Sequence, residues 1–158
     1  MPAETTTARG DPSSPLLKLH QLGQSYWLDN LTRSMIANGE LKQRVDHEGL
    51  AGVTSNPAIF HKAFAGSDIY DSEIAGLAAA GKSAGEIYEQ LTTEDVRDAC
   101  DILRGTYEKS LGYDGLVSLE VSPHLARDTE ASIEEARRLW RTVDRPNLLI
   151  KIPGTRQG

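Results

Sequence analysis

The sequence has few cysteines, no dense run of basic residues and no long apolar run, and each shortage excludes a class of protein. Its single cysteine cannot form an internal disulfide. A net charge of -6 without clustered Lys or Arg argues against a nucleic-acid or acidic-membrane partner. No stretch approaches the length of a membrane span, and residues 1–15 lack the hydrophobic core of a signal peptide. The shortages predict a cytoplasmic protein with small-molecule partners.

Length and composition predict one soluble globular domain. The chain has 158 residues, of which 39% are hydrophobic and 25% are charged, as is usual for such a domain. Residues 1–15 are rich in Thr, Ser, Pro and Ala and are expected to form a flexible tail, because they cannot bury enough surface to offset ordering. The domain is then 16–158. Cys100 falls at helical spacing with Val96 and Leu103, which predicts a core thiol.

Hydrophobic periodicity predicts strands that alternate with helices. The expected strands are 25–29, 52–56, 116–122 and 147–153. Helices are expected at 16–22, 32–47 with an interruption near Gly39, from Pro57 onward, 69–80, 84–91, 94–111 and 129–143. Ser83 and Thr93 are read as helix starts, Gly81 and Gly112 as helix ends, and Asn56 as a helix N-cap. Strands separated by helices indicate a parallel sheet with crossover connections.

Lys151 stands in the middle of the apolar segment NLLIKIPGT, which has the composition of a buried strand. A cation there loses hydration that its neighbours cannot replace, which favours the neutral amine. A neutral amine attacks carbonyl carbon, so Lys151 is a candidate Schiff-base nucleophile. The alternative is that Lys151 lies at a strand end and extends its charged group to water.

Each predicted strand carries a polar residue near its C-terminal end: Asp29, Asn56, Glu120 and Lys151. In a parallel (β/α) barrel these ends converge on one mouth, where the chemistry of that fold is assembled. Taken singly, each has a structural alternative. Asp29 or Asn56 could cap the next helix, and Glu120 could form a structural ion pair with Lys151. A shared level on successive strands favours a functional site.

Alternation along the third strand separates two faces. Val117, Leu119 and Val121 form an apolar face suited to covering helices. Ser118 and Glu120 point to the opposite face of the strand.

These segments together resemble the transaldolases. The resemblance is carried, in the order in which the segments occur, by GQSYWLDNLTR (23–33), GVTSNPAIF (52–60), DGLVSLEVSPHLARDTEASIEEARRLW (114–140) and LIKIPGT (149–155). The first segment is similar to the longer bacterial branch of the family, some members of which are fused to a glucose-6-phosphate isomerase. The resemblance implies a (β/α)8 TIM barrel of the class I aldolase type.

The resemblance also implies an activity that needs no metal and no cofactor. It would transfer a dihydroxyacetone unit from a ketose phosphate to an aldose phosphate, as in the pentose phosphate pathway. By motif, Lys151 would form the Schiff base, Asp29 would act as acid and base in carbon–carbon cleavage, and Glu120 would assist carbinolamine dehydration through water. Asn56 and Thr54 would bind hydroxyls of the dihydroxyacetone unit.

The chain is shorter than the family pattern, since a whole barrel needs about 250 residues and the sequence predicts only the first strands. We therefore expect the N-terminal half of a barrel, with negligible activity by itself. Its open edges predict self-association into a homo-oligomer or poor solubility. Two alternatives remain: a Schiff-base aldolase that cleaves without transfer, and a half-barrel with no catalysis of its own.

Overall fold

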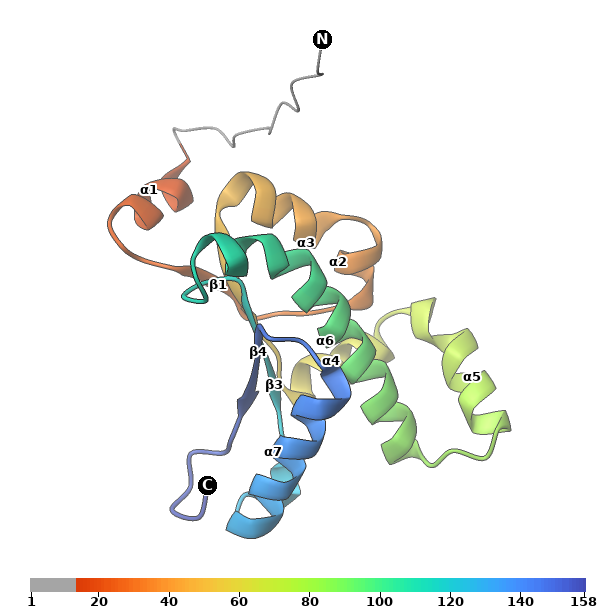
Figure 1. Cartoon of the computed structure of the whole chain (residues 1–158). Helices are drawn as coiled ribbons and strands as arrows, with labels where there is room; N and C mark the ends of the chain where they lie inside the picture. Colours follow the sequence, from red (N-terminus) through yellow and green to blue (C-terminus); the bar gives the residue numbers. More distant parts are fainter. Residues whose placement is uncertain (1–13) are drawn as a thin grey trace.

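The structure, a computed structural model, describes residues 14–158 and contains one parallel sheet (Figure 1). Its strands are β1 (Tyr26–Leu28), β2 (Leu50–Thr54), β3 (Leu116–Glu120) and β4 (Leu148–Lys151). They lie in the order β1-β2-β3-β4, and every neighbouring pair is parallel. This sequential order with intervening helices is that of consecutive strands in a (β/α)8 barrel, so the predicted partial barrel is confirmed.

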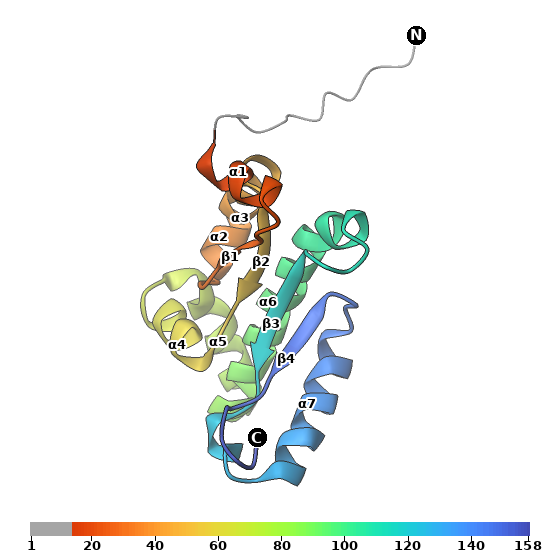
Figure 2. The same ribbon diagram turned by 90° about the vertical axis from the view of Figure 1, so that its left-hand side faces the viewer.

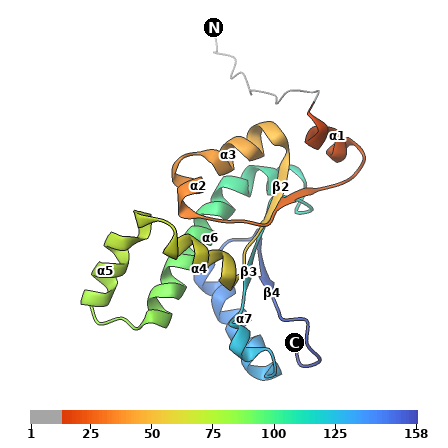
Figure 3. The ribbon, with the colours of Figure 1, turned by 180° about the vertical axis from the view of Figure 1, so that it is seen from behind.

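The helices follow the strands as crossover connections require. The connections contain α2 (Arg33–Ala37), α3 (Glu40–Gln43) and the π-helical turn η1 (Arg44–Glu48) after β1; α4 (Pro57–Ala65), η2 (Asp68–Tyr70), α5 (Asp71–Ala79) and α6 (Ala84–Lys109) after β2; η3 (Pro123–Leu125) and α7 (Thr129–Val143) after β3. In Figure 2, α6 passes behind β3 and the near face of β3 and β4 is open. Figure 3 shows that α6 and α7 lie on one side of β3 and β4, while the C-terminal segment lies on the other side. Within residues 14–158, no helix has the length and hydrophobicity needed to cross a membrane.

The core lies between the sheet and these helices. Val117, Leu119 and Val121 are all buried in it, as strand alternation predicted. The helix α6 contributes Leu103 and Cys100 to the same core, so the predicted core thiol is confirmed. Burying each side chain of this size contributes about 1.5–3 kcal/mol, and this packing fixes which strand face remains open.

The first helix, α1 (Pro15–Gln21), begins at Pro15, inside the segment that was predicted to be a tail. Proline suits this position because the first helical residues do not need their N–H groups for hydrogen bonds within the helix. The rest of the predicted tail, residues 1–13, lies outside the described residues.

The prediction of two helices at 84–91 and 94–111 is wrong, because α6 runs without a break from Ala84 to Lys109. Thr93 was read as a start signal, but its hydroxyl donates to the carbonyls of Glu89 (2.8 Å) and Gln90 (3.0 Å) in the preceding turn. Threonine can satisfy its hydroxyl in this way inside a helix. The real start is at Ser83, which forms a capping box with Glu86.

Candidate active site

The residues that the sequence singled out lie together at the C-terminal ends of the strands. Glu120 and Lys151 are the last residues of β3 and β4 and lie directly opposite each other in the strand register. Thr54 is the last residue of β2, and Asp29 follows the end of β1. Parallel pairing places all these C-terminal strand ends together, which is where barrel enzymes assemble their chemistry.

Lys151 contacts two groups from different parts of the chain. Its Nζ lies 3.1 Å from Glu120 Oε2 and donates a hydrogen bond of 3.2 Å to the backbone carbonyl of Ser55. The side chain therefore reaches past β3 to the residue that follows β2. Sequence reasoning missed Ser55, although it lies inside the motif GVTSNPAIF. Its own hydroxyl is buried and donates to the Ser118 carbonyl at 2.6 Å, which fixes the backbone that faces Lys151.

Asp29 is paired with Thr54 across the first two strands. The Thr54 hydroxyl donates to Asp29 Oδ1 at 2.5 Å. Asp29 does not cap the next helix, because the Thr32 side chain accepts the Met35 N–H at the start of α2. The structural alternative for Asp29 is therefore wrong, and its exposed carboxylate is open to solvent.

Asn56 does cap the helix that follows it. Its Oδ1 accepts the Ile59 N–H at 3.0 Å at the start of α4, as the structural alternative predicted. The cap uses only the oxygen of the amide. The Nδ2 group donates no hydrogen bond within residues 14–158, so a ligand hydroxyl could accept from it.

The expected burial of Lys151 is a prediction that the structure contradicts. Its side chain is 40% exposed, and the neighbouring Leu149 and Ile152 are 44% and 36% exposed. The apolar run lies on β4, which pairs with β3 on one side only among the described strands. A strand at the edge of a sheet keeps solvent access that an interior strand loses.

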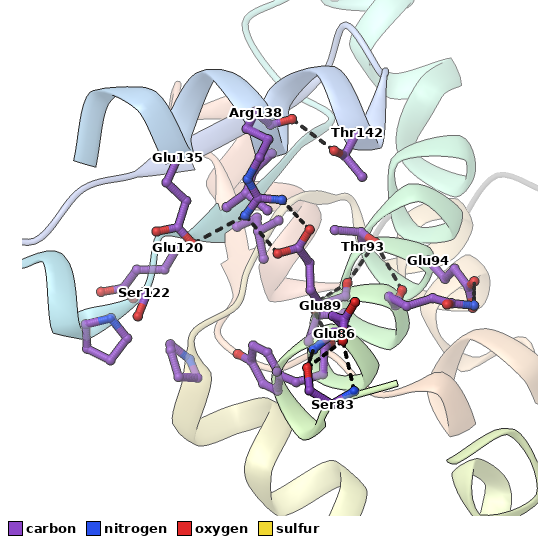
Figure 4. A pocket seen from close by; sticks show the side chains of 18 of the residues that line it. Ser83, Glu86, Glu89, Thr93, Glu94, Glu120, Ser122, Glu135, Arg138 and Thr142 are labelled. Atoms are coloured by element: carbon purple, nitrogen blue, oxygen red, sulfur yellow. Dashed lines mark hydrogen bonds and ion pairs between the residues drawn. The ribbon is translucent and has the colours of Figure 1, made fainter. Parts of the chain in front are cut away.

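A cavity of about 1030 Å³ lies between α6 and α7 and extends to Glu120. Figure 4 shows Glu120 and Ser122 at its margin, with Arg138 of α7 directed toward Glu89 of α6 and toward Glu135. The cavity is lined by both acidic and basic side chains, and Arg138 already forms ion pairs with Glu89 and Glu135. Among residues 14–158, no group of three metal-ligating side chains is present. The cavity leaves one side of Glu120 accessible to water.

Comparison with known proteins shows the family of this chain. The family model described as Transaldolase/Fructose-6-phosphate aldolase matches residues 26–158. The chain belongs to this family. It is 55% identical over 143 residues to Transaldolase 2 of Nostoc punctiforme and 52% identical over 143 residues to the transaldolase of Trichodesmium erythraeum. It is also 49% identical over 145 residues to the transaldolase of Thermobifida fusca. These results confirm the family predicted from the sequence motifs.

The matches cover most of this chain but a minor part of each relative. The alignments with Nostoc punctiforme and Trichodesmium erythraeum each cover 90% of this chain and 38% of the relative, and the Thermobifida fusca alignment covers 92% and 39%. The chain thus spans about two fifths of the length of the transaldolases that it matches.

Proposed function

We propose that this chain supplies the Schiff-base lysine and the acid–base residues of a transaldolase. The enzyme transfers a dihydroxyacetone unit from a ketose phosphate to an aldose phosphate, as a cytoplasmic step of the pentose phosphate pathway. The observation that carries the proposal is the contact between Lys151 and Glu120 at the strand ends. Membership of the family supports it.

The Lys151 amine attacks the ketose carbonyl carbon and forms a carbinolamine, which loses water to give the imine. Dehydration requires a proton at the departing hydroxyl, and Glu120 is within 3.1 Å of the nitrogen that forms the imine. Glu120 accepts the proton that the Lys151 ammonium loses before the attack and returns it to the departing hydroxyl through a water molecule, which the adjoining cavity can admit. The imine then accepts the electron pair of the breaking carbon–carbon bond.

Asp29 accepts the proton of the donor hydroxyl as that bond breaks, and the aldose product leaves. The remaining three-carbon enamine attacks the aldehyde carbon of the acceptor, and Asp29 returns the proton to the new hydroxyl. Hydrolysis of the imine releases the product and restores Lys151. The hydrogen bond from Thr54 holds Oδ1 of Asp29 in place. The other carboxylate oxygen of Asp29 can then accept and return the proton of the substrate hydroxyl.

Thr54 and Asn56 hold the hydroxyls of the three-carbon unit. The free Nδ2 of Asn56 supplies a donor, while its Oδ1 is kept in place by the start of α4. An amide whose orientation is fixed by a cap can position a substrate without first losing side-chain freedom.

A Schiff-base aldolase that cleaves without transfer is the second candidate. The matching family model is described as Transaldolase/Fructose-6-phosphate aldolase, and a Schiff-base lysine is compatible with either reaction. The two differ in whether the three-carbon unit leaves as free dihydroxyacetone or passes to an acceptor.

The test uses a completed enzyme, in which this chain is joined to the part of the Nostoc punctiforme transaldolase that follows the matching segment. A ketose phosphate is supplied with and without an aldose phosphate acceptor. We expect sustained turnover only with acceptor, and its loss in Lys151→Met but not in the matched Lys62→Met. Release of dihydroxyacetone without acceptor would favour the aldolase. No turnover in either assay would contradict both candidates.

A further inference from the structure

A buried hydrogen-bond network lies behind the connection from β1 to α2. Tyr70 of η2 and Asp95 of α6 have no exposed side-chain surface. The Tyr70 hydroxyl donates to Asp95 Oδ2 at 2.7 Å, and Arg33 Nε donates to Asp95 Oδ1 at 2.6 Å. The Arg33 guanidinium also pairs with Glu73 and lies 4.8 Å from the centre of the Tyr70 ring. The network joins segments separated by 37 and 62 residues in the sequence.

The network ends on a backbone group. Arg33 is the first residue of α2, and its N–H belongs to the donors that a helix cannot satisfy internally. The Tyr70 hydroxyl oxygen accepts this N–H at 2.8 Å while donating its own proton to Asp95. The Tyr70 hydroxyl therefore holds the start of α2 together with the Thr32 cap.

Burial and hydrogen bonding act in opposite directions on the pKa values of the charged groups in the network. Burial alone would lower the pKa of Arg33, but its hydrogen bonds to Glu73 and Asp95 outweigh burial and raise it. For Asp95, burial is the larger effect and raises the pKa, although the hydrogen bonds from Arg33 and Tyr70 oppose this rise. The Tyr70 hydroxyl thus supports both the backbone of α2 and the carboxylate beneath it.

The short loop between β1 and α2 connects this network to Asp29. At its start, Asp29 is held by the Thr54 hydroxyl, and in its middle Leu31 is fully buried. At its end, Arg33 is held by Tyr70. A loop fixed at these points has little freedom to change the position of the Asp29 carboxylate.

We propose that Tyr70, Arg33 and Asp95 are positioning residues for Asp29, acting through the backbone of the β1 to α2 loop. This inference rests on the proposed role of Asp29 in carbon–carbon cleavage. A displacement of about 1 Å at a reacting group can reduce its rate about a hundredfold, so control of this loop has a direct consequence for turnover.

The first experiment tests the structural link in the 158-residue chain itself. Tyr70→Phe removes one oxygen and keeps the ring. We expect amide hydrogen exchange at Arg33 to become about tenfold faster, because the amide loses its acceptor. Tyr107→Phe, the same change at a tyrosine of α6 that has no contact with this network, should leave this rate unchanged. An unchanged Arg33 rate in Tyr70→Phe would overturn the inference.

The second experiment tests the functional link in the completed enzyme with Tyr70→Phe, Asp29→Asn and the double variant. We expect Tyr70→Phe to lower kcat about ten- to hundredfold at constant KM, with borohydride trapping at Lys151 unchanged. In the Asp29→Asn background, Tyr70→Phe should cause no further fall. An equal fall in both backgrounds would mean a general structural role and would overturn the inference. Absence of trapping at Lys151 would instead contradict the proposed function, whatever the amide exchange shows.

Discussion

The Glu120 carboxylate and the Lys151 amine lie 3.1 Å apart at the ends of two neighbouring parallel strands. The register that pairs these residues is set by the packing of Val117 and Leu119 against the helices on the opposite face. A shift of one residue would turn one of the two side chains toward the core. The contact is therefore a consequence of the fold.

Glu120→Gln should slow imine formation in the completed enzyme about a hundred- to ten-thousandfold, because the amide cannot deliver the proton for dehydration. The rate is measured by quenching with borohydride at successive times. Glu135→Gln, a change in the same cavity, should have little effect. Faster imine formation in Glu120→Gln would show that the carboxylate only keeps Lys151 charged.

Asp29→Ala should affect turnover far more than imine formation, since its proposed step follows the imine. We expect turnover to fall about a hundred- to ten-thousandfold, with the trapped fraction preserved. Asp46→Ala, at an exposed carboxylate paired with Lys42, is the matched control. If trapping and turnover fell together, Asp29 would have a structural or substrate-binding role.

Asp95→Ala should destabilise the chain by about 3–5 kcal/mol, because it leaves the Arg33 guanidinium and the Tyr70 hydroxyl without a buried partner. Urea unfolding of the 158-residue chain measures this change. Arg104→Ala, which removes a solvent-exposed pair with Glu108, should change stability by no more than about 0.5 kcal/mol. Equal losses in the two variants would contradict the importance of the buried network.

Acid should weaken the connection between α6 and the start of β4. Arg145 donates two hydrogen bonds to the Asp101 carboxylate, at 2.5 and 2.9 Å, and these lower the pKa of Asp101 from 3.8. A lowered folded-state pKa contributes stability above the unfolded value, and this stability is lost as pH falls through the folded value. The stability difference between the natural chain and Asp101→Asn should therefore shrink below about pH 4. A difference independent of pH would contradict this role for the pair.

Local sequence patterns predicted the elements but not every environment. The predicted strands ended at residues 56, 122 and 153, two residues beyond the observed ends at Thr54, Glu120 and Lys151. The Asn56 cap follows from the proline after it. The exposure of Lys151 could not be predicted from its apolar neighbours, because it depends on which strand lies beside β4.

The buried hydrogen-bond network of Arg33, Tyr70 and Asp95 could not be predicted from the sequence, because its members are far apart along the chain. Arg33, Tyr70 and Asp95 belong to three elements and meet only after the crossover between β2 and β3 has formed. In the same way, Thr93 has the appearance of a helix start in the sequence, and only the continuity of α6 shows that its hydroxyl is satisfied within the helix. Contacts between distant parts of the chain determine these features, and hydrophobic periodicity carries no information about such contacts.

The central claim is that Lys151 forms the Schiff base, and borohydride trapping tests it most directly. The completed enzyme is incubated with a ketose phosphate, reduced, digested and mapped by mass spectrometry. We predict a reduced adduct on the peptide that contains Lys151, and its absence in Lys151→Met. An adduct at Lys62, Lys82 or any other lysine, or none at all in an enzyme that still turns over, would contradict the account.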